Sequence, residues 1–228
     1  MYSLIAASVF FLLIHFSVSG TRLRDVLVAR MGAGPYRGAF AVASIVGLVW
    51  MSSAYSHAAT VDLWGQLIGL RPLAFALLLL AFLLVGIGLA TPSPTQVGME
   101  SQLAQGTDLV RGVVRITRHP FLWGVGLWAF VHLVVNGDLA SLILFGSLLL
   151  LALGGTASID AKRRRSFGDQ WSRFAQATSN IPFAAIATGR NQLGPALREI
   201  GILRPVIAIA AYVMVLIFHG RLFGAPLV

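Results

Sequence analysis

The chain has 228 residues, of which 57% are hydrophobic and only 11% are charged, and its mean hydropathy is +0.82. Because soluble domains carry about 25% charged residues, this composition excludes a disordered chain and an ordinary soluble enzyme. The net charge of +9 would suit nucleic acid if it lay on a soluble surface. Here the basic residues separate apolar blocks, so we expect membrane lipids and no nucleic acid as partners. Cysteine is absent, which excludes disulfides, thiolate metal sites and a Cys nucleophile.

Six apolar blocks have, or nearly have, the length of about 20 residues that a transmembrane helix needs. They are residues 2–19, 38–56, 72–90, 121–136, 139–158 and 203–218, of which the fourth and sixth are short. Asn136-Gly137-Asp138 is a turn signal, so the fourth and fifth blocks should form a helical hairpin. We therefore predict an all-α fold. It is a polytopic membrane bundle of six transmembrane helices in a single domain, residues 1–228, with one or two interfacial amphipathic helices.

Two stretches between the blocks have the spacing of amphipathic helices. Residues 102–117 and their C-terminal flank place basic side chains four and three residues apart, and residues 160–178 follow a basic run with aromatic residues at the same spacing. The side chains concerned are Arg111, Arg115 and Arg118 in the first stretch and Phe167, Trp171 and Phe174 in the second. These helices either lie on anionic lipid or form the floor of a ligand site.

The basic residues also predict an orientation. Fifteen of the 17 Lys and Arg residues lie in three segments, 20–37, 91–120 and 159–204. By the positive-inside rule these segments are cytoplasmic, and both termini lie on the opposite side. Val18-Ser19-Gly20 would fit a signal-peptide cleavage site, but no basic residue precedes the first block, which favours a retained span.

The five histidines are the main candidates for function, because ionisable residues inside a membrane are costly and are retained for a reason. At 1.5 Å per residue, His15 lies roughly 8 Å and His132 roughly 18 Å from the cytoplasmic ends of their blocks, so both belong to the apolar slab. His57 and His219 lie at outer ends of blocks, and His57, which follows Tyr55, is a substitute ligand. For each histidine the alternative is an interfacial residue bonded to water.

His132 shares one helix face with Gly124 and Trp128, because the three residues are four apart. Glycine permits a close approach, and the Trp128 ring offers a stacking surface. Such a face suits haem, and it equally suits simple packing against another helix.

Arg118-His119-Pro120 marks a break before the fourth block. Proline is well placed as the first residue of a helix and disfavours helical geometry at the residue before it. We therefore expect the Arg118 and His119 side chains to face the headgroup region, where they either hold an anionic group or serve as a membrane anchor.

Taken together, several motifs resemble the NnrU family of bacterial membrane proteins over nearly the whole chain. They lie at residues 36–48, 116–124, 128–133, 136–141, 159–160, 178–183 and 189–190. The resemblance implies a role in denitrification, in a bacterial inner membrane, alongside proteins of the nitrite and nitric oxide reductase systems.

That family is similar to the plant 15-cis-zeta-carotene isomerase, a membrane enzyme that contains haem b. The likeness implies His15 and His132 as axial ligands of haem b, a hydrophobic small-molecule substrate, and activity as an isomerase or a maturation factor. Arg115 and Arg118 are then candidates for the haem propionates, with lipid phosphate as an equal candidate. The isomerase has a cysteine three residues before its second ligand, and Ala129 stands there in this chain.

A second likeness is to the isoprenylcysteine and phospholipid methyltransferases, which use S-adenosylmethionine. It rests on Arg-His-Pro-x-x-x-Gly and on Phe167-Gly168-x-x-Trp171. Leu122 replaces the usual tyrosine of the motif, and Ile159-Asp160 stands where those enzymes have an acidic pair. A membrane methyltransferase and a non-catalytic assembly protein therefore remain as alternatives.

Overall fold

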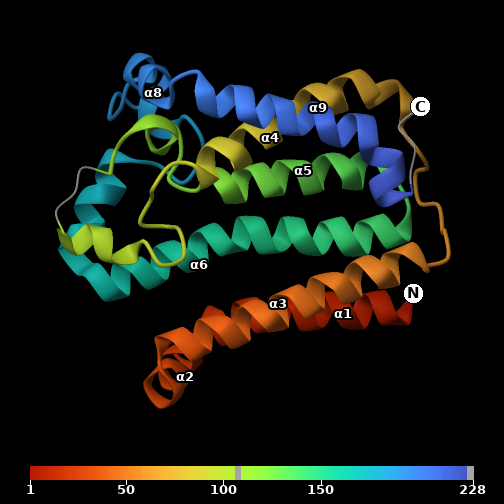
Figure 1. The fold of residues 1–228 in the computed structure, drawn as a ribbon, viewed down its shortest axis with the longest axis horizontal. Coiled ribbons are helices and arrows are strands. Elements are labelled where there is room, and N and C mark those ends of the chain that lie inside the picture. Colours follow the sequence, from red (N-terminus) through yellow and green to blue (C-terminus); the bar gives the residue numbers. More distant parts are fainter. Residues whose placement is uncertain (106–108, 225–228) are drawn as a thin grey trace. The chain divides into compact units, whose positions relative to one another are not determined.

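The computed structural model describes residues 1–105 and 109–224, and this part of the chain is helical almost throughout (Figure 1). The α-helices are α1 (Tyr2–Leu13), α2 (Leu23–Met31), α3 (Ala33–Ser56), α4 (Arg71–Leu89), α5 (Pro120–Asn136), α6 (Leu139–Ala177), α7 (Ala184–Ala187), α8 (Leu193–Ile200) and α9 (Leu203–Phe223). A π-helix (Ile14–Ser19) follows α1, and 3₁₀ segments lie at Ile68–Leu70, Glu100–Gln105 and Gly112–Arg115. The predicted all-α class is confirmed.

Helices of membrane-spanning length match the predicted blocks closely. Within the described residues, five apolar helical segments are long enough to cross a bilayer: Tyr2–Ser19, Ala33–Ser56, Ile68–Leu89, Leu139–Ala177 and Leu203–Phe223. The predicted fourth span is α5, which has 17 residues and is shorter than the usual span. Five spans are therefore supported by length, and α5 is a shorter apolar helix.

The chain divides into two compact units. Unit 1 comprises Met1–Ala74 and Ala129–Ile159, and unit 2 comprises Phe75–Trp128 and Asp160–Val228. We describe the two units separately.

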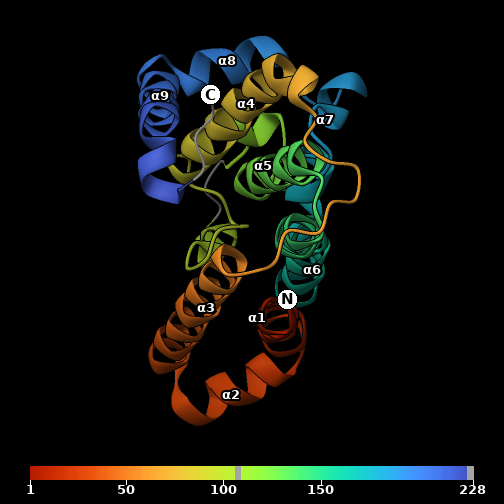
Figure 2. The ribbon, with the colours of Figure 1, turned by 90° about the vertical axis from the view of Figure 1, so that its right-hand side faces the viewer.

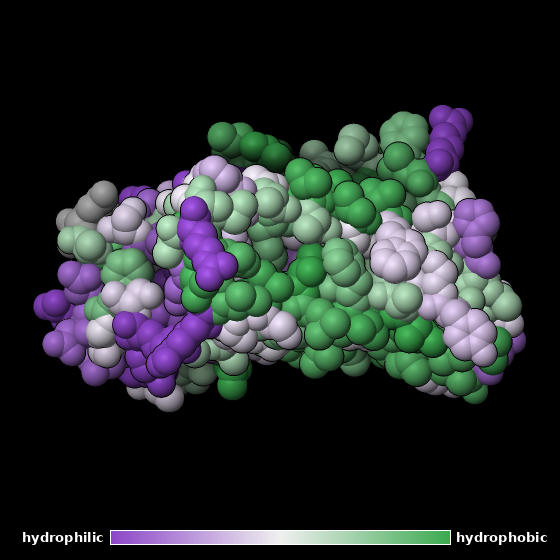
Figure 3. Space-filling model, turned by 90° about the horizontal axis from the view of Figure 1, so that it is seen from below, coloured by the Kyte–Doolittle hydropathy of each residue, from purple (hydrophilic) through white to green (hydrophobic). Residues whose placement is uncertain are grey.

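In unit 1, α1 packs along α3, and α2 connects them (Figure 2). Gly47 of α3 permits this contact, because a Cβ there would lie only 3.0 Å from the Phe11 ring of α1 and 3.2 Å from the Phe10 ring. The outward surface of α3 is apolar, with Val42, Ile45, Val46 and Val49 all exposed. Hydrophobic side chains of this kind form a broad area on the face drawn in Figure 3, as expected where lipid replaces water.

The predicted hairpin turn between the fourth and fifth blocks is confirmed. Helix α5 ends at Asn136, α6 begins at Leu139, and Gly137 has φ +68° between them. The Gly137 carbonyl oxygen accepts bonds from the backbone N–H groups of residues 63–65. A side chain at Gly137 would collide with the Gly65 carbonyl, so the turn fixes the loop that follows α3.

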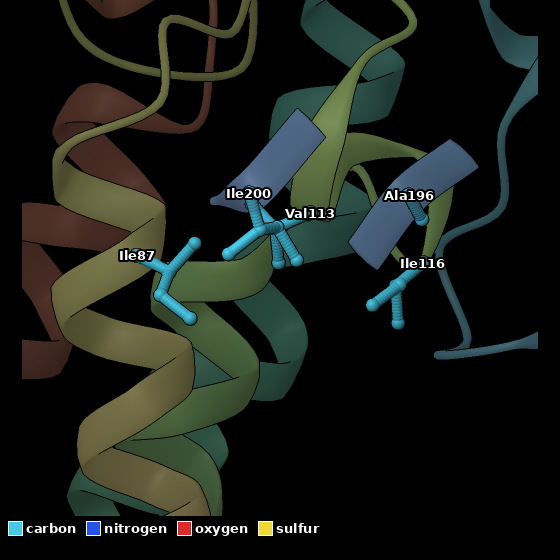
Figure 4. Packing of buried hydrophobic residues seen from close by; sticks show 5 residues of the cluster. All are labelled: Ile87, Val113, Ile116, Ala196 and Ile200. Carbon is cyan, nitrogen blue, oxygen red and sulfur yellow. The ribbon is translucent and has the colours of Figure 1, made fainter. Parts of the chain in front are cut away.

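In unit 2, the 3₁₀ segment Gly112–Arg115 contributes to an apolar cluster with α4 and α8 (Figure 4). The buried members of the cluster are Ile87, Val113, Ile116, Ala196 and Ile200. A second cluster joins Val114 to Trp171 and Phe174 of α6. Together the two clusters hold the backbone that leads into Arg118 and His119.

Of the two stretches predicted to form interfacial helices, one is helical and the other does not form a single helix. Residues 160–177 are helical but continue α6, whose helical geometry breaks at Gly168 (φ +48°). Residues 102–117 do not form one helix, because Gly112 has φ +55°, a conformation that interrupts a right-handed helix. Residues 106–108 of that stretch lie outside the described residues.

Candidate functional site

His15 lies in the π-helix that follows α1, and its ring orientation is fixed by the backbone. Its Nδ1 is 2.8 Å from the carbonyl oxygen of Phe11. A carbonyl can only accept, so Nδ1 is the donor in this bond, and in the neutral ring Nε2 is then the nitrogen without a proton. This is the tautomer in which an imidazole binds a metal through Nε2. Short π segments within α-helices often occur at functional sites.

Aromatic rings surround His15. The Phe11 ring centroid lies 4.5 Å from that of His15, and the Phe40 ring meets His15 edge-on at 5.1 Å. Phe40 in turn stacks on Tyr36 at 6.0 Å. The imidazole is therefore held in an apolar environment supplied by α1 and α3.

The residue after His15 anchors the π-helix on α6. Gly154 of α6 leaves room for the Phe16 ring, since a Cβ at Gly154 would lie 2.9 Å from Phe16 Cζ. This close approach sets the position of the π-helix, and so of His15, along α6.

His132 lies on α5 against the face of the Phe145 ring of α6. The ring centroids are 4.9 Å apart and the planes differ by 29°. Tyr55, near the end of α3, also contacts Phe145, with the two rings edge-on and their centroids 5.9 Å apart. His132 is thus placed by the hairpin of α5 and α6 and by the last turns of α3.

His15 and His132 both belong to unit 1, and they reach α6 at different levels. Phe16 packs at Gly154 and His132 packs at Phe145, which are nine residues apart, or about 14 Å along a helix. The sequence predicted an offset in the same direction.

Haem and a metal ion held by the protein alone need different sets of side chains. No group of three or more His, Cys, Asp or Glu side chains that could hold a metal ion exists among them. Haem needs at most two axial ligands from the protein, because the macrocycle supplies the other nitrogen ligands. His15 and His132, whose rings lie against aromatic side chains, match that number.

His119 is placed differently from the prediction. Its side chain is buried, with only 2% of the residue exposed, and Nε2 lies 2.7 Å from Asp160 Oδ1. The expectation that His119 faces the headgroup region is therefore wrong. The reason is a carboxylate 41 residues further along the chain, which offers the ring a buried acceptor.

Arg118 shares the same carboxylate. Its Nη2 and Nε lie 2.5 and 3.0 Å from Asp160 Oδ2, and its guanidinium lies over the Trp171 ring at 5.7 Å. The anionic group that we expected Arg118 to hold is here a side chain of the protein.

The pKa of His119 is lowered from its ordinary value. Burial is the main cause, because it penalises the charged form, and the positive charges of Arg118 and Arg163 act in the same direction. The hydrogen bond to Asp160 opposes this effect without reversing it. His119 is therefore a neutral imidazole that donates from Nε2 to Asp160.

Arg115 also binds the protein. Its Nε and Nη2 each lie 2.8 Å from a Glu199 oxygen of α8, and its Nη1 lies 3.0 Å from Asn191 Oδ1. The hydrogen bond from Arg115 is the main reason that the pKa of Glu199 lies below its usual value. In unit 2, Arg115 thus pairs with Glu199 and Arg118 pairs with Asp160. These are the two arginines that we predicted to bind haem propionates or lipid phosphate.

Two candidates remain, His57 and Trp128. His57 is exposed at the end of α3, with Nδ1 2.8 Å from the Ser53 carbonyl oxygen. Trp128 is half-buried on α5 at the end of its unit 2 segment. At Gly124 the helix-packing alternative is supported, because a Cβ there would lie 2.7 Å from Val85 Cγ2 of α4.

Sequence reasoning missed a polar cluster around Ser141 in unit 1, in which Tyr55, Asn136 and Asp138 take part. One signal was present, because Asp138 three residues before Ser141 is an N-cap pattern. The contribution of Tyr55 has no local signal.

The fold defines an all-helical protein with several helices of membrane-spanning length. The chain belongs to the NnrU family, since the profile of the family described as "NnrU protein" matches residues 3–227. It is 30% identical to the chloroplastic 15-cis-zeta-carotene isomerase of Arabidopsis thaliana and 28% identical to that of Zea mays, over 116 residues in each case. These matches cover 51% of this chain and 30% of each isomerase. No solved structure matches.

Proposed function

We propose that this protein is a membrane isomerase or maturation factor that holds haem b through His15 and His132. The observation that carries the proposal is the arrangement of these two imidazoles in unit 1. Both lie against aromatic rings, and the bond from His15 Nδ1 to Phe11 presents the tautomer that a metal binds. The likeness to the carotene isomerases supports a hydrophobic small-molecule substrate.

The chain's own contribution is to bind and to exclude water. His15 and His132 would hold the iron from α1 and α5, while the Phe11, Phe40 and Phe145 rings keep the site apolar. Bound haem would supply a redox-active iron whose potential depends on its axial ligands and on burial. Ala129, which is fully buried, cannot act as an alternative ligand as a cysteine could.

The cellular role belongs to the same proposal. We infer that the protein lies in a bacterial inner membrane and supports denitrification together with the nitrite and nitric oxide reductase systems. The charge distribution supports an orientation with both termini in the periplasm, which requires the shorter helix α5 to cross the membrane as a sixth span. In a chain without native cysteine, a single Ser166→Cys should be labelled only from the cytoplasm and Ser56→Cys only from the periplasm. Both residues are exposed, so labelling of both from one side would refute this orientation.

Purified protein from cells supplied with haem tests the cofactor directly. The proposal predicts a Soret band and one haem b per chain by the pyridine haemochrome assay. A protein without haem that binds S-adenosylmethionine would instead be a methyltransferase, and a protein that binds neither would be a non-catalytic assembly protein.

A further inference from the structure

Ser141 is the centre of a buried hydrogen-bond cluster in unit 1. The residue is fully buried, and its Oγ lies 2.6 Å from Asp138 Oδ2, 3.1 Å from Asn136 Nδ2 and 2.9 Å from the Tyr55 hydroxyl. A serine hydroxyl has one proton and two lone pairs, and a carboxylate can only accept. The Ser141 proton therefore goes to Asp138, and Ser141 accepts from Asn136 and from Tyr55. The Tyr55 hydroxyl is thus the donor, in a fixed direction.

Ser141, the acceptor for Tyr55, lies in the first turn of α6, which is held by several hydrogen bonds. Asp138 caps α6, because its Oδ1 accepts the backbone N–H of Ser141 at 2.9 Å. The turn that carries Asp138 is bonded to the loop after α3, with Leu139 N–H donating to Val61 at 2.9 Å. Trp64 of that loop donates from Nε1 to the carbonyl oxygen of Val134, also at 2.9 Å.

The ring of Tyr55 transmits this constraint toward His132. Phe145 follows Ser141 by one helical turn, so both side chains lie on the same face of α6. The Tyr55 ring is edge-on to Phe145, and Phe145, only 6% exposed, stacks on His132. If the Tyr55 ring moves, the Phe145 ring has more space to rotate. The His132 ring then loses the aromatic face that sets its orientation.

We propose that Tyr55 is a positioning residue for His132, acting through its hydrogen bond to Ser141 and its contact with Phe145. The effect of Tyr55 on an iron ligand rests on the proposed function. Its effect on the orientation of the His132 ring does not depend on haem.

The surroundings of His15 provide a matched control. Tyr36 stacks on Phe40, and Phe40 meets His15 edge-on, so the order of rings is the same as around His132. The Tyr36 hydroxyl, however, is buried with no hydrogen-bond partner among the described residues. Tyr36→Phe removes a hydroxyl that makes no such bond, whereas Tyr55→Phe removes one that donates to Ser141.

The first experiment needs no haem. Full-length haem-free protein is treated with diethylpyrocarbonate at constant pH, and the modification rate of each histidine is followed by mass spectrometry. Tyr55→Phe should speed modification of His132 about fivefold, the factor that one ordinary hydrogen bond is worth, and Ser141→Ala should act in the same direction. Tyr36→Phe should leave His132 unchanged. An unchanged rate at His132 in both Tyr55→Phe and Ser141→Ala would overturn the proposal.

The second experiment uses haem-loaded protein and measures the midpoint potential and the low-spin ferric EPR signal. Tyr55→Phe should shift the potential and broaden the signal, and Tyr36→Phe should change neither. An unchanged potential in Tyr55→Phe with bound haem would overturn the link to the iron. If the wild type binds no haem, the proposed function fails, while the modification rates still decide whether Tyr55 positions His132.

Discussion

Two kinds of histidine environment distinguish the two units. In unit 1, His15 and His132 lie against the rings of Phe11 and Phe145, respectively. In unit 2, His119 is bonded to Asp160 beside Arg118. A buried imidazole bonded to a carboxylate stabilises the fold through that bond, whereas the two imidazoles that lie against aromatic rings are the ones that we propose as iron ligands. The proposed ligands therefore belong to unit 1, and the buried polar cluster around His119 belongs to unit 2.

The largest effect should come from removing the shared carboxylate. Asp160→Ala leaves the Arg118 charge buried without its main partner and should cost about 3–5 kcal/mol of unfolding free energy. Asp169→Ala, at an exposed position on the same helix, should cost less than about 0.5 kcal/mol. Denaturant titration in detergent measures both. Equal stability of the two variants would show that the cluster in unit 2 is not structural.

The contact beneath His15 should be next in size. Gly154→Ala forces a methyl group against the Phe16 ring and should cost about 1–3 kcal/mol of packing, of which helix propensity returns up to about 1 kcal/mol, with a loss of bound haem because the π-helix shifts. At Gly146 the nearest atom to an added Cβ is 3.6 Å away, so Gly146→Ala gains up to about 1 kcal/mol of helix propensity. Thermal midpoints and haem content of the two variants check this prediction. A normal haem content in Gly154→Ala would show that the packing of Phe16 does not affect haem binding.

The smallest effect is a pH dependence that belongs to His119. Its pKa is lowered in the folded state, chiefly by burial, so below about pH 6.5 the unfolded chain takes up a proton that the folded protein refuses. Stability should therefore fall as the pH falls below 6.5, by at most about 1.4 kcal/mol per pH unit, and should not change above that pH through this group.

His119→Gln is the control for that titration, because an amide can still donate to Asp160 and does not titrate. Between pH 7.5 and pH 5.5, the thermal midpoint of the wild type should fall by more than that of His119→Gln. A constant difference over this range would mean that His119 is not a buried neutral imidazole.

Much of the fold was predictable, because it depends on local pattern. The apolar blocks match α1, α3, α4, α5, α6 and α9 to within a few residues at most ends. The turn at Gly137 was predictable because only a short polar stretch with glycine separates two blocks. The length of a helix depends on residues that are close in sequence, so a hydropathy pattern is enough to predict it.

Long-range partners were not predictable in the same way. His119 and Arg118 read as headgroup contacts because their own surroundings, next to Pro120, are those of a helix entrance. Their burial depends on Asp160, which the sequence related to Arg-His-Pro only through the likeness to the methyltransferases. Tyr55 and Ser141 are 86 residues apart, and no periodicity relates them. The haem ligands stay a prediction, supported by the aromatic surroundings of both imidazoles.

The haem content of three histidine variants tests the central claim most directly. His15→Ala, His132→Ala and His119→Ala are purified under the same conditions, and the Soret absorbance per folded chain is compared with that of the wild type. We expect His15→Ala and His132→Ala to lose most of the bound haem, while His119→Ala loses stability but keeps haem in its folded fraction. Loss of haem in His119→Ala, with His15→Ala and His132→Ala unaffected, would contradict the assignment of the ligands to unit 1.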